Sequence, residues 1–326
     1  MQHKENETIT IAFEDLDAFQ TLCGQFDENL KRLESKMHVT LRVRGNEVTV
    51  SGSEQDVAKA KTLLTELYEV AKRGATVGAQ EIDRALAVVA VEPNVSIREL
   101  MSGGIRLQGA ETVVIPKTPN QKAYLDAMSK NDVVLAIGPA GTGKTYLAMA
   151  FALWCLFGKK VKHIVLTRPA VEAGERLGFL PGDMVEKVNP YLRPLYDALY
   201  DIMGYERGGG LITKGVIEIA PLAFMRGRTL SNCFIILDEA QNCSIEQMKM
   251  LLTRIGYNSK VVVTGDVTQT DLPAGKISGL SHARQILAKI KGVAVCEFNE
   301  RDVMRHPVVA EILKAYDAYE RRVKKR

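Results

Sequence analysis

The loop at residues 138–145, Gly-Pro-Ala-Gly-Thr-Gly-Lys-Thr, constrains this chain of 326 residues more than any other feature. It has the spacing Gly-x-x-x-x-Gly-Lys-Thr, and it stands between an apolar run typical of a strand and a segment typical of a helix. The glycines let the backbone curl so that successive N–H groups point inward, and the helix N-terminus adds partial positive charge. We therefore expect this loop to bind phosphate groups.

The phosphates are expected to be those of a nucleoside triphosphate, ATP with Mg²⁺. Lys144 is predicted to reach the β- and γ-phosphates, and the hydroxyl of Thr145 is predicted to bind Mg²⁺. The alternative is a glycine-rich turn without a ligand. The residues predicted to surround the nucleotide here are Gly138, Pro139, Ala140, Gly141, Thr142, Gly143, Lys144 and Thr145.

Short apolar runs rich in β-branched residues alternate with helical stretches from residue 120 onward. Such runs predict strands buried on both faces, as in a parallel sheet with helices on either side. We expect an α/β fold with a doubly wound parallel sheet, in which ligands bind beyond the carboxyl ends of the strands. The predicted strands are residues 133–137, 163–167, 216–219, 233–237, 261–264 and 293–298.

Asp238 and Glu239 directly follow one of these predicted strands. Two carboxylates at the end of a buried strand cost free energy unless a bound group needs their charge, as Mg²⁺ with ATP does. Asp238 is predicted to hold the metal, and Glu239 is predicted to orient and deprotonate the attacking water. In the alternative interpretation, one of the two carboxylates caps the helix expected near residues 244–254.

Polar residues at other strand ends are further candidates. Gln269 is a candidate γ-phosphate sensor and Asp266 a candidate partner of the attacking water, whereas the alternative is a glycine turn with a solvated loop. Arg168 is a candidate contact for phosphate or a nucleic acid strand. Gln121, which precedes the first core strand, is a candidate reader of the adenine edge, or else a merely exposed side chain.

Two arginines, Arg301 and Arg305, follow the last predicted strand. An arginine near a γ-phosphate contributes about 10³–10⁵ in rate, whereas the alternative for each is a surface ion pair. The residues predicted to take part in catalysis are therefore Lys144, Glu239, Gln269, Arg301 and Arg305.

The first 74 residues have a different pattern, β-α-α-β-β-α. We expect a strand at 7–13, a helix at 15–36 interrupted near Cys23 and Gly24, and a hairpin of strands 39–43 and 47–51. A helix capped by Ser53 then runs to about residue 73. The domains are thus predicted as 1–74, a transition segment at 75–111 that includes a helical pattern at 79–91, and 112–326.

Charge divides between the two parts of the chain. Residues 1–110 contain 13 Lys+Arg and 17 Asp+Glu, a net −4, and residues 111–326 contain 30 and 22, a net +8. The positive field of the second part attracts nucleic acid, anionic ligands or acidic partners, or is simply a solvated surface. With no secretory signal, no membrane-length apolar run and five scattered cysteines, we expect a cytoplasmic protein.

Together the motifs resemble those of the PhoH-like proteins of bacteria over roughly residues 112–320. The resemblance rests on Thr118-Pro-Asn-Gln121, the loop at 138–145, Thr167-Arg-Pro-Ala170, Gly178-Phe-Leu-Pro-Gly-Asp183, Leu237-Asp-Glu-Ala-Gln-Asn242, Thr264-Gly-Asp-Val-Thr-Gln269 and Arg301-Asp-Val-Met-Arg-His306. It implies an ATPase core similar to one RecA-like domain of superfamily 1 helicases, with a link to RNA metabolism. Some relatives carry a PIN-type ribonuclease domain that we do not find in this chain, so no nuclease activity is expected. Stand-alone members are associated with an rRNA-maturation endoribonuclease, which is therefore an expected partner.

The N-terminal unit resembles a KH-like domain, an RNA-binding module with a Gly-x-x-Gly loop. Here that loop reads Gly24-Gln-Phe-Asp27, and an acid in place of the second glycine repels phosphate. The alternative is an oligomerisation or docking module. Superfamily 1 helicases place ATP between two RecA-like domains, so a chain with one such core implies a homo-oligomeric ring, with Arg301 or Arg305 acting in trans.

Three functions fit this sequence. The first is an ATPase that remodels or unwinds RNA, and the second is an ATP-switched scaffold that docks a ribonuclease or ribosomal factor with little turnover. The third is a protein-remodelling ring.

Overall fold

A computed structural model describes residues 6–74, 76–91, 104–107, 113–169, 184–273, 275–304, 308, 309 and 312. The chain divides into two compact units, residues 1–104 with 115–122, and residues 105–114 with 123–326. None of the helices in the described ranges combines the length and the apolarity needed to span a bilayer.

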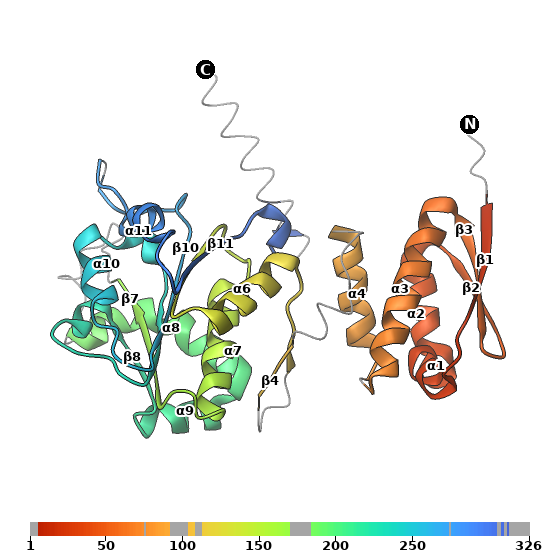
Figure 1. Cartoon of the computed structure of the whole chain (residues 1–326), viewed down its shortest axis with the longest axis horizontal. Helices are drawn as coiled ribbons and strands as arrows, with labels where there is room; N and C mark the ends of the chain where they lie inside the picture. The colour runs from red at the N-terminus through yellow and green to blue at the C-terminus, as the bar shows by residue number, and fades with distance from the viewer. Residues whose placement is uncertain are drawn as a thin grey trace, which may run out of the picture. The chain divides into compact units, whose positions relative to one another are not determined.

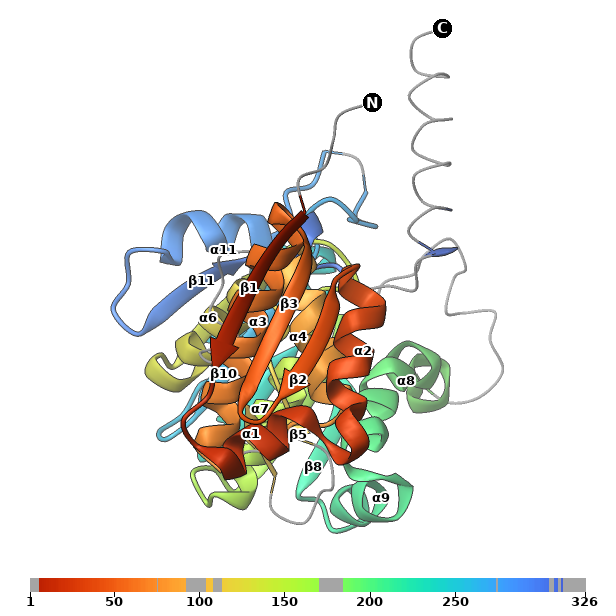
Figure 2. The same ribbon diagram turned by 90° about the vertical axis from the view of Figure 1, so that its right-hand side faces the viewer.

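The N-terminal unit is a three-stranded antiparallel sheet with helices on one face (Figure 2). Its strands are β1 (Asn6–Ala12), β2 (Thr40–Arg44) and β3 (Glu47–Ser53), in the order β1-β3-β2. Side chains alternate between the faces of such a sheet. Val48 and Val50 are therefore buried in the core, while Thr10 and Thr49 share a hydrogen bond at an exposed position.

The helices of this unit agree with the predicted pattern. They are α1 (Leu16–Cys23), the short η1 (Gln25–Asp27), α2 (Glu28–Met37), α3 (Glu54–Lys72) and α4 (Ala79–Val91). Ser53 caps α3 as predicted, because its hydroxyl accepts the N–H of Asp56. Helix α4 buries Ile82 and Ala85 in the same core as α2 and α3, so part of the predicted transition segment belongs to this unit.

The second unit is an α/β fold around a six-stranded sheet whose strands are all parallel. All six predicted strands are confirmed with small shifts at their ends. In spatial order they are β11 (Val293–Glu297), β6 (Val133–Ile137), β10 (Lys260–Gly265), β9 (Cys233–Leu237), β7 (His163–Arg168) and β8 (Ile217–Pro221).

Helices cover both faces of this sheet (Figure 1). Alternate residues of β9 separate into two cores, with Phe234 and Ile236 in one and Ile235 and Leu237 in the other. The first core includes α6 (Pro119–Lys130), α7 (Lys144–Phe157) and α8 (Met184–Met203); α9 (Tyr205–Thr213) packs beside α8. The second includes η3 (Leu222–Met225), α10 (Ile245–Leu252) and α11 (Gly279–Leu287). Because helices bury both faces of the sheet, the sequences of its strands are continuous apolar runs.

Three small elements complete the described fold. Strands β4 (Ile105–Arg106) and β5 (Val113–Val114) form an antiparallel ribbon. The 3₁₀ turns η4 (Ala240–Asn242) and η5 (Glu300–Asp302) follow β9 and β11. Both turns lie just after the carboxyl ends of their strands, where the site is built.

Two helical glycines should respond to alanine in opposite directions. At Gly279, the first residue of α11, an added Cβ would lie 2.4 Å from the carbonyl oxygen of Ser244. At Gly209, inside α9, the same position has no neighbour within 4 Å. Thermal unfolding should show Gly279→Ala destabilised by about 1–3 kcal/mol and Gly209→Ala stabilised by about 0.5–1 kcal/mol. Equal effects would contradict the close packing of α11.

Candidate functional site

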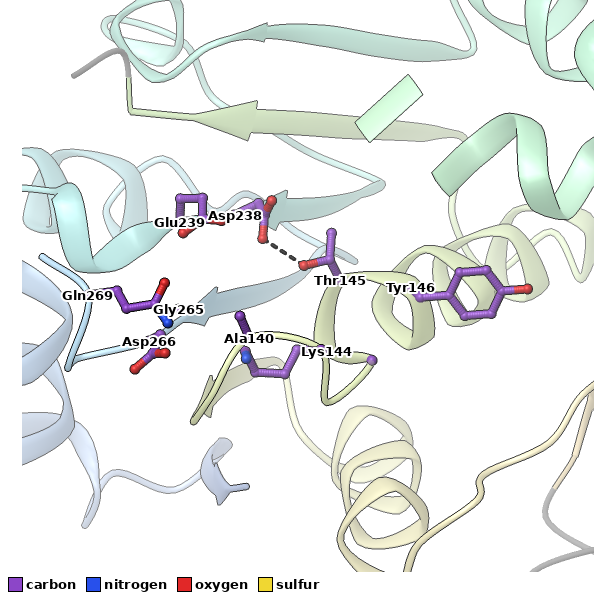
Figure 3. Close-up of a pocket in the computed structure, with 11 residues that line it drawn as sticks. Ala140, Lys144, Thr145, Tyr146, Asp238, Glu239, Gly265, Asp266 and Gln269 are labelled. Carbon is purple, nitrogen blue, oxygen red and sulfur yellow. Dashed lines mark hydrogen bonds between the residues drawn. The ribbon is translucent and has the colours of Figure 1, made fainter. Parts of the chain in front are cut away.

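A pocket of about 260 Å³ opens at the carboxyl edge of the parallel sheet, where β6, β10 and β9 end side by side (Figure 3). The position agrees with the rule that ligands of such sheets bind beyond the strand ends. The residues that line it are Ala140, Gly141, Gly143, Lys144, Thr145, Tyr146, Asp238, Glu239, Gly265, Asp266 and Gln269. The structure thus brings together most of the predicted site residues, although they are far apart in the sequence.

The loop at 138–145 has the curled backbone that its glycines predict. Gly141 and Gly143 have φ values of 81° and 80°, in the region that favours glycine. At Gly138 an added Cβ would lie 2.5 Å from the carbonyl oxygen of Phe298, so no larger residue fits. Gly143 is the N-cap of α7 without a side-chain cap, which leaves helix N–H groups available for an anion.

Lys144 directs its ammonium group into this loop. Its Nζ donates hydrogen bonds of 2.7 Å to the carbonyl oxygens of Gly138 and Pro139. Burial lowers the pKa of Lys144, and the carboxylates of Asp266, Asp238 and Glu239 oppose that shift. Lys144 is 8% exposed, and its ammonium group faces these three carboxylates across the pocket.

Asp238 is held by donors from three other elements. Its Oδ1 accepts hydrogen bonds of 2.6 Å from the hydroxyls of Thr145 and Thr264, the first of which is drawn in Figure 3. Its Oδ2 accepts a bond of 2.9 Å from Nε of Arg168. A hydroxyl and a carboxylate oxygen in contact are the hard oxygen ligands that Mg²⁺ prefers, so Thr145 and Asp238 fit a Mg²⁺ site.

Glu239 has an unusual backbone. It adopts the left-handed conformation, with φ 54° and ψ 38°, which costs a non-glycine residue about 1–2 kcal/mol. Its carboxylate accepts bonds of 2.8 Å from Arg168 and 2.5 Å from the side chain of Gln241. Strain that two side chains maintain at a pocket is typical of a functional residue.

The alternative role of the acidic pair as a helix cap is wrong for α10. Ser244 occupies that position, and it forms a capping box with Gln247. Glu239 stands at the start of η4 but makes no side-chain cap bond. The carboxylates therefore face the pocket rather than a helix end.

Arg168 binds the acidic pair, and its predicted contact with phosphate or nucleic acid stays a prediction. Its guanidinium binds both carboxylates of the acidic pair, and its NH1 donates to the carbonyl oxygen of Tyr191 in α8 at 2.8 Å. The side chain is 14% exposed. A planar fork suits this bridging of two acceptors, which a lysine cannot reproduce. Arg168 thereby joins β7, the acidic pair and α8.

Asp266 contributes a carboxylate oxygen without a partner. Its Oδ1 accepts bonds from the backbone and hydroxyl of Thr268, whereas its buried Oδ2 has no hydrogen-bond partner among the described residues. A buried acceptor of this kind calls for an explanation, and here it belongs to a residue that lines the pocket. It suits a ligand that donates a hydrogen bond, such as water.

Sequence reasoning missed two contributors, Gln241 and Thr264. The side-chain oxygen of Gln241 accepts the N–H of Asp266 at 3.0 Å, so this residue joins Glu239 to the loop after β10. Thr264 binds Asp238. The available signals were a glutamine two residues beyond the acidic pair and a threonine at the end of an apolar strand.

The remaining predicted residues are placed as follows. Gln269 lines the pocket, and its N–H donates to the carbonyl oxygen of Asp266 at 3.0 Å. Arg301 is exposed in η5 and does not line the pocket, whereas Arg305 lies outside the described residues. Gln121 is buried rather than exposed, and its side-chain oxygen accepts the N–H of Lys117 at 2.6 Å. Its predicted role as a base reader stays a prediction.

Two of three comparisons with known proteins agree on one family. A family model described as PhoH-like protein matches residues 113–317. A PhoH-like protein of Mycobacterium tuberculosis (strain ATCC 25618 / H37Rv) is 53% identical over 92% of this chain and 85% of its own length. A PhoH-like protein of Bacillus subtilis (strain 168) is 45% identical over 92% and 94%. A crystal structure of FlhF complexed with GMPPNP and Mg²⁺ aligns with 85% of this chain and 93% of its own, but 14% identity and a TM-score of 0.19 support no conclusion.

Removal of Arg168 should destabilise the fold. Arg168→Ala leaves the carboxylate of Asp238, whose side chain is 7% exposed, without its cation. The expected loss is about 3–5 kcal/mol in the free energy of unfolding. Arg228→Ala is the control: Arg228 pairs with Glu218, both are more than a third exposed, and the loss should be at most about 1 kcal/mol.

A double-mutant cycle in urea checks the cause of this loss. If the buried charge of Asp238 is responsible, Asp238→Asn should recover much of the stability lost in Arg168→Ala. Additive losses would show that Arg168 acts through packing instead.

Proposed function

The chain belongs to the PhoH-like family, and from this premise we propose that it is a Mg²⁺-dependent ATPase that serves RNA remodelling or rRNA maturation. One observation carries the proposal. Lys144, the oxygen pair of Thr145 and Asp238, and the strained Glu239 line one pocket beyond the strand ends. The spatial order, with β10 between the strand of the phosphate loop and the strand of the acidic pair, also supports a RecA-like core.

The phosphate loop binds the phosphate groups of ATP. Backbone N–H groups of the loop and of the α7 N-terminus take the phosphate oxygens, and Lys144 neutralises charge on the β- and γ-phosphates. Thr145 and Asp238 hold Mg²⁺, which when bound neutralises negative charge on the phosphate oxygens. The site therefore orients the γ-phosphate toward the acidic pair.

Hydrolysis requires an activated water. Glu239 takes a proton from water as the water oxygen bonds to the γ-phosphorus, and the bond from that phosphorus to the oxygen of ADP breaks. Gln269 and Asp266 line the same pocket, where Gln269 donates a hydrogen bond to the γ-phosphate and Asp266 accepts one from the water. Arg168 and Gln241 are positioning residues, because each holds the carboxylate of Glu239.

Glu239→Gln should abolish hydrolysis without abolishing ATP binding. The amide keeps the shape of the carboxylate but cannot accept a proton, and general bases contribute about 10²–10⁴ in rate. Phosphate release should therefore fall at least about a hundredfold, while fluorescent ATP binding stays within a few-fold. Glu246→Gln, at an exposed position on α10, is the control and should retain full activity. Unchanged phosphate release by Glu239→Gln would make the hydrolase proposal wrong.

RNA is the proposed macromolecular partner of the second unit. Residues 111–326, which contain most of this unit, have a net charge of +8 from 30 Lys+Arg and 22 Asp+Glu, and this charge attracts the phosphate backbone. The resemblance of the motifs to those of PhoH-like proteins also implies a link to RNA metabolism. It makes an rRNA-maturation endoribonuclease the second proposed partner. The three-stranded sheet with helices on one face supports the KH-like interpretation of the N-terminal unit, although Asp27 replaces the second loop glycine.

A homo-oligomeric ring is proposed to complete the pocket. Lys144 is the only cation among its described lining residues, whereas phosphoryl transfer generally benefits from an arginine at the γ-phosphate. A neighbouring copy would supply Arg301 or Arg305 to that pocket. Such a head-to-tail contact closes into a ring.

The alternative is an ATP-switched scaffold with little turnover. One observation favours it: both oxygens of Glu239 already accept hydrogen bonds from protein side chains, so fewer of its lone pairs are left to take a proton from water. In that case ATP loading would control the docking of a ribonuclease or ribosomal factor, and hydrolysis would be incidental.

RNA should distinguish these functions. For an RNA-linked ATPase we expect single-stranded RNA to raise the rate of phosphate release about tenfold, with the effect lost at high salt because counterions compete. Light scattering of the same samples should give a mass above 36.0 kDa, the mass of one chain. A rate that ignores RNA would favour the scaffold, and a monomer with full activity would contradict the arginine in trans.

A further inference from the structure

The N-terminal unit contains a groove that the ATPase proposal does not use. It has a volume of about 930 Å³ and is lined by residues of α1, of the α1–α2 connection and of the β2–β3 turn. The turn is fixed beside the start of α1, because Asn46 exchanges hydrogen bonds of 3.0 and 2.8 Å with the backbone of Phe13. The groove is thus formed by a well-packed part of this unit.

Apolar side chains are exposed along this groove. Leu16 and Val43 line it, and they are 61% and 39% exposed. Phe26 stands between the lining residues Gln25 and Asp27 and is 91% exposed. Exposed apolar side chains in and next to a groove mark a binding surface more often than a free one.

The backbone at Phe26 is strained. Phe26 and Asp27 have φ values of 51° and 58°, two consecutive non-glycine residues in the left-handed region. The ammonium of Lys31 holds this turn through a bond of 2.9 Å to the carbonyl oxygen of Phe26. Despite this strain the aromatic ring of Phe26 remains exposed, so the strained backbone does not serve to bury it in the core. This points to a role in binding rather than in folding.

The charge of the groove selects the partner. Asp17, Asp27 and Glu28 line it, and no Lys, Arg or His is among its described lining residues. Three carboxylates repel the phosphates of a nucleic acid and attract cationic groups. The surrounding part of the chain is also acidic, with a net −4 over residues 1–110 from 13 Lys+Arg and 17 Asp+Glu.

We propose that this groove binds a basic, apolar peptide segment of a protein partner. Apolar side chains of the segment pack against Leu16, Phe26 and Val43, and its Lys or Arg side chains pair with Asp17, Asp27 and Glu28. Aromatic anchors flanked by charges are typical of such interfaces. The N-terminal unit thus docks protein at this groove, and this inference holds whether or not the second unit hydrolyses ATP.

The test uses the full chain and labelled probes in fluorescence anisotropy. The probes are a peptide of about ten residues composed of Leu and Lys, which extends over about 33 Å, its counterpart with Glu for Lys, and an oligouridine of about ten nucleotides. Glu28→Lys is matched by the control Glu54→Lys. Both glutamates are exposed first residues of helices, and only Glu28 lines the groove.

The Leu/Lys peptide should bind better than its Glu counterpart, and Glu28→Lys should weaken its binding about tenfold while Glu54→Lys has no effect. Phe26→Gly separates binding from folding, because glycine relieves the left-handed strain. It should weaken peptide binding about tenfold with an unchanged or higher melting temperature. Equal effects of Glu28→Lys and Glu54→Lys would overturn the proposal, because the groove would then not be the binding site. Loss of oligouridine binding in Phe26→Gly would also overturn it and would assign the groove to nucleic acid.

Discussion

The neutralisation of two carboxylates at the end of a buried strand organises the second unit. Strand β9 is buried along its whole length, and Asp238 and Glu239 follow it. Water cannot solvate Asp238 there, so protein donors must. Arg168 brings in β7 and α8, Thr145 brings in α7, and Thr264 brings in β10. The bonds that satisfy one acidic pair thereby join β7, β9, β10, α7 and α8 around the pocket.

The same bonds connect stability with the proposed chemistry. Glu239 is held by Arg168 on one oxygen and by Gln241 on the other, and Gln241 also holds the backbone of Asp266. A base fixed in this way has a defined direction, which favours catalysis, but its lone pairs are shared with donors, so fewer are left to take a proton from water. The balance between the two effects decides between an active hydrolase and a slow switch.

The two units differ in the sign of their charge, and this supports a division of binding roles. The acidic groove of the N-terminal unit favours a cationic peptide, whereas the net positive second unit favours the RNA backbone. Under the two proposals, one chain would hold RNA and a protein partner at the same time. In the proposed arrangement, Asp27 at the position of the second loop glycine would pair with a cationic ligand.

The sequence by itself determined the elements and the chemistry of the loop. Local rules suffice where the signal is local: the six apolar strands, the curled glycines at 138–145 and the Ser53 cap depend on neighbouring residues alone. It also identified Lys144 from the spacing of the loop, and Asp238 and Glu239 because charge at the end of a buried strand is costly in any fold. Only the tertiary structure decided the partners of these charges.

Arg168 could be recognised as the cation of the acidic pair, and Gln241 as the link to Asp266, only once β7, β9 and β10 were placed side by side. The same holds for the oxygen of Asp266 that has no partner among the described residues, and for the groove beside Phe26. Hydrogen bonds between distant residues depend on strand order and on side-chain direction, and neither is encoded in local periodicity.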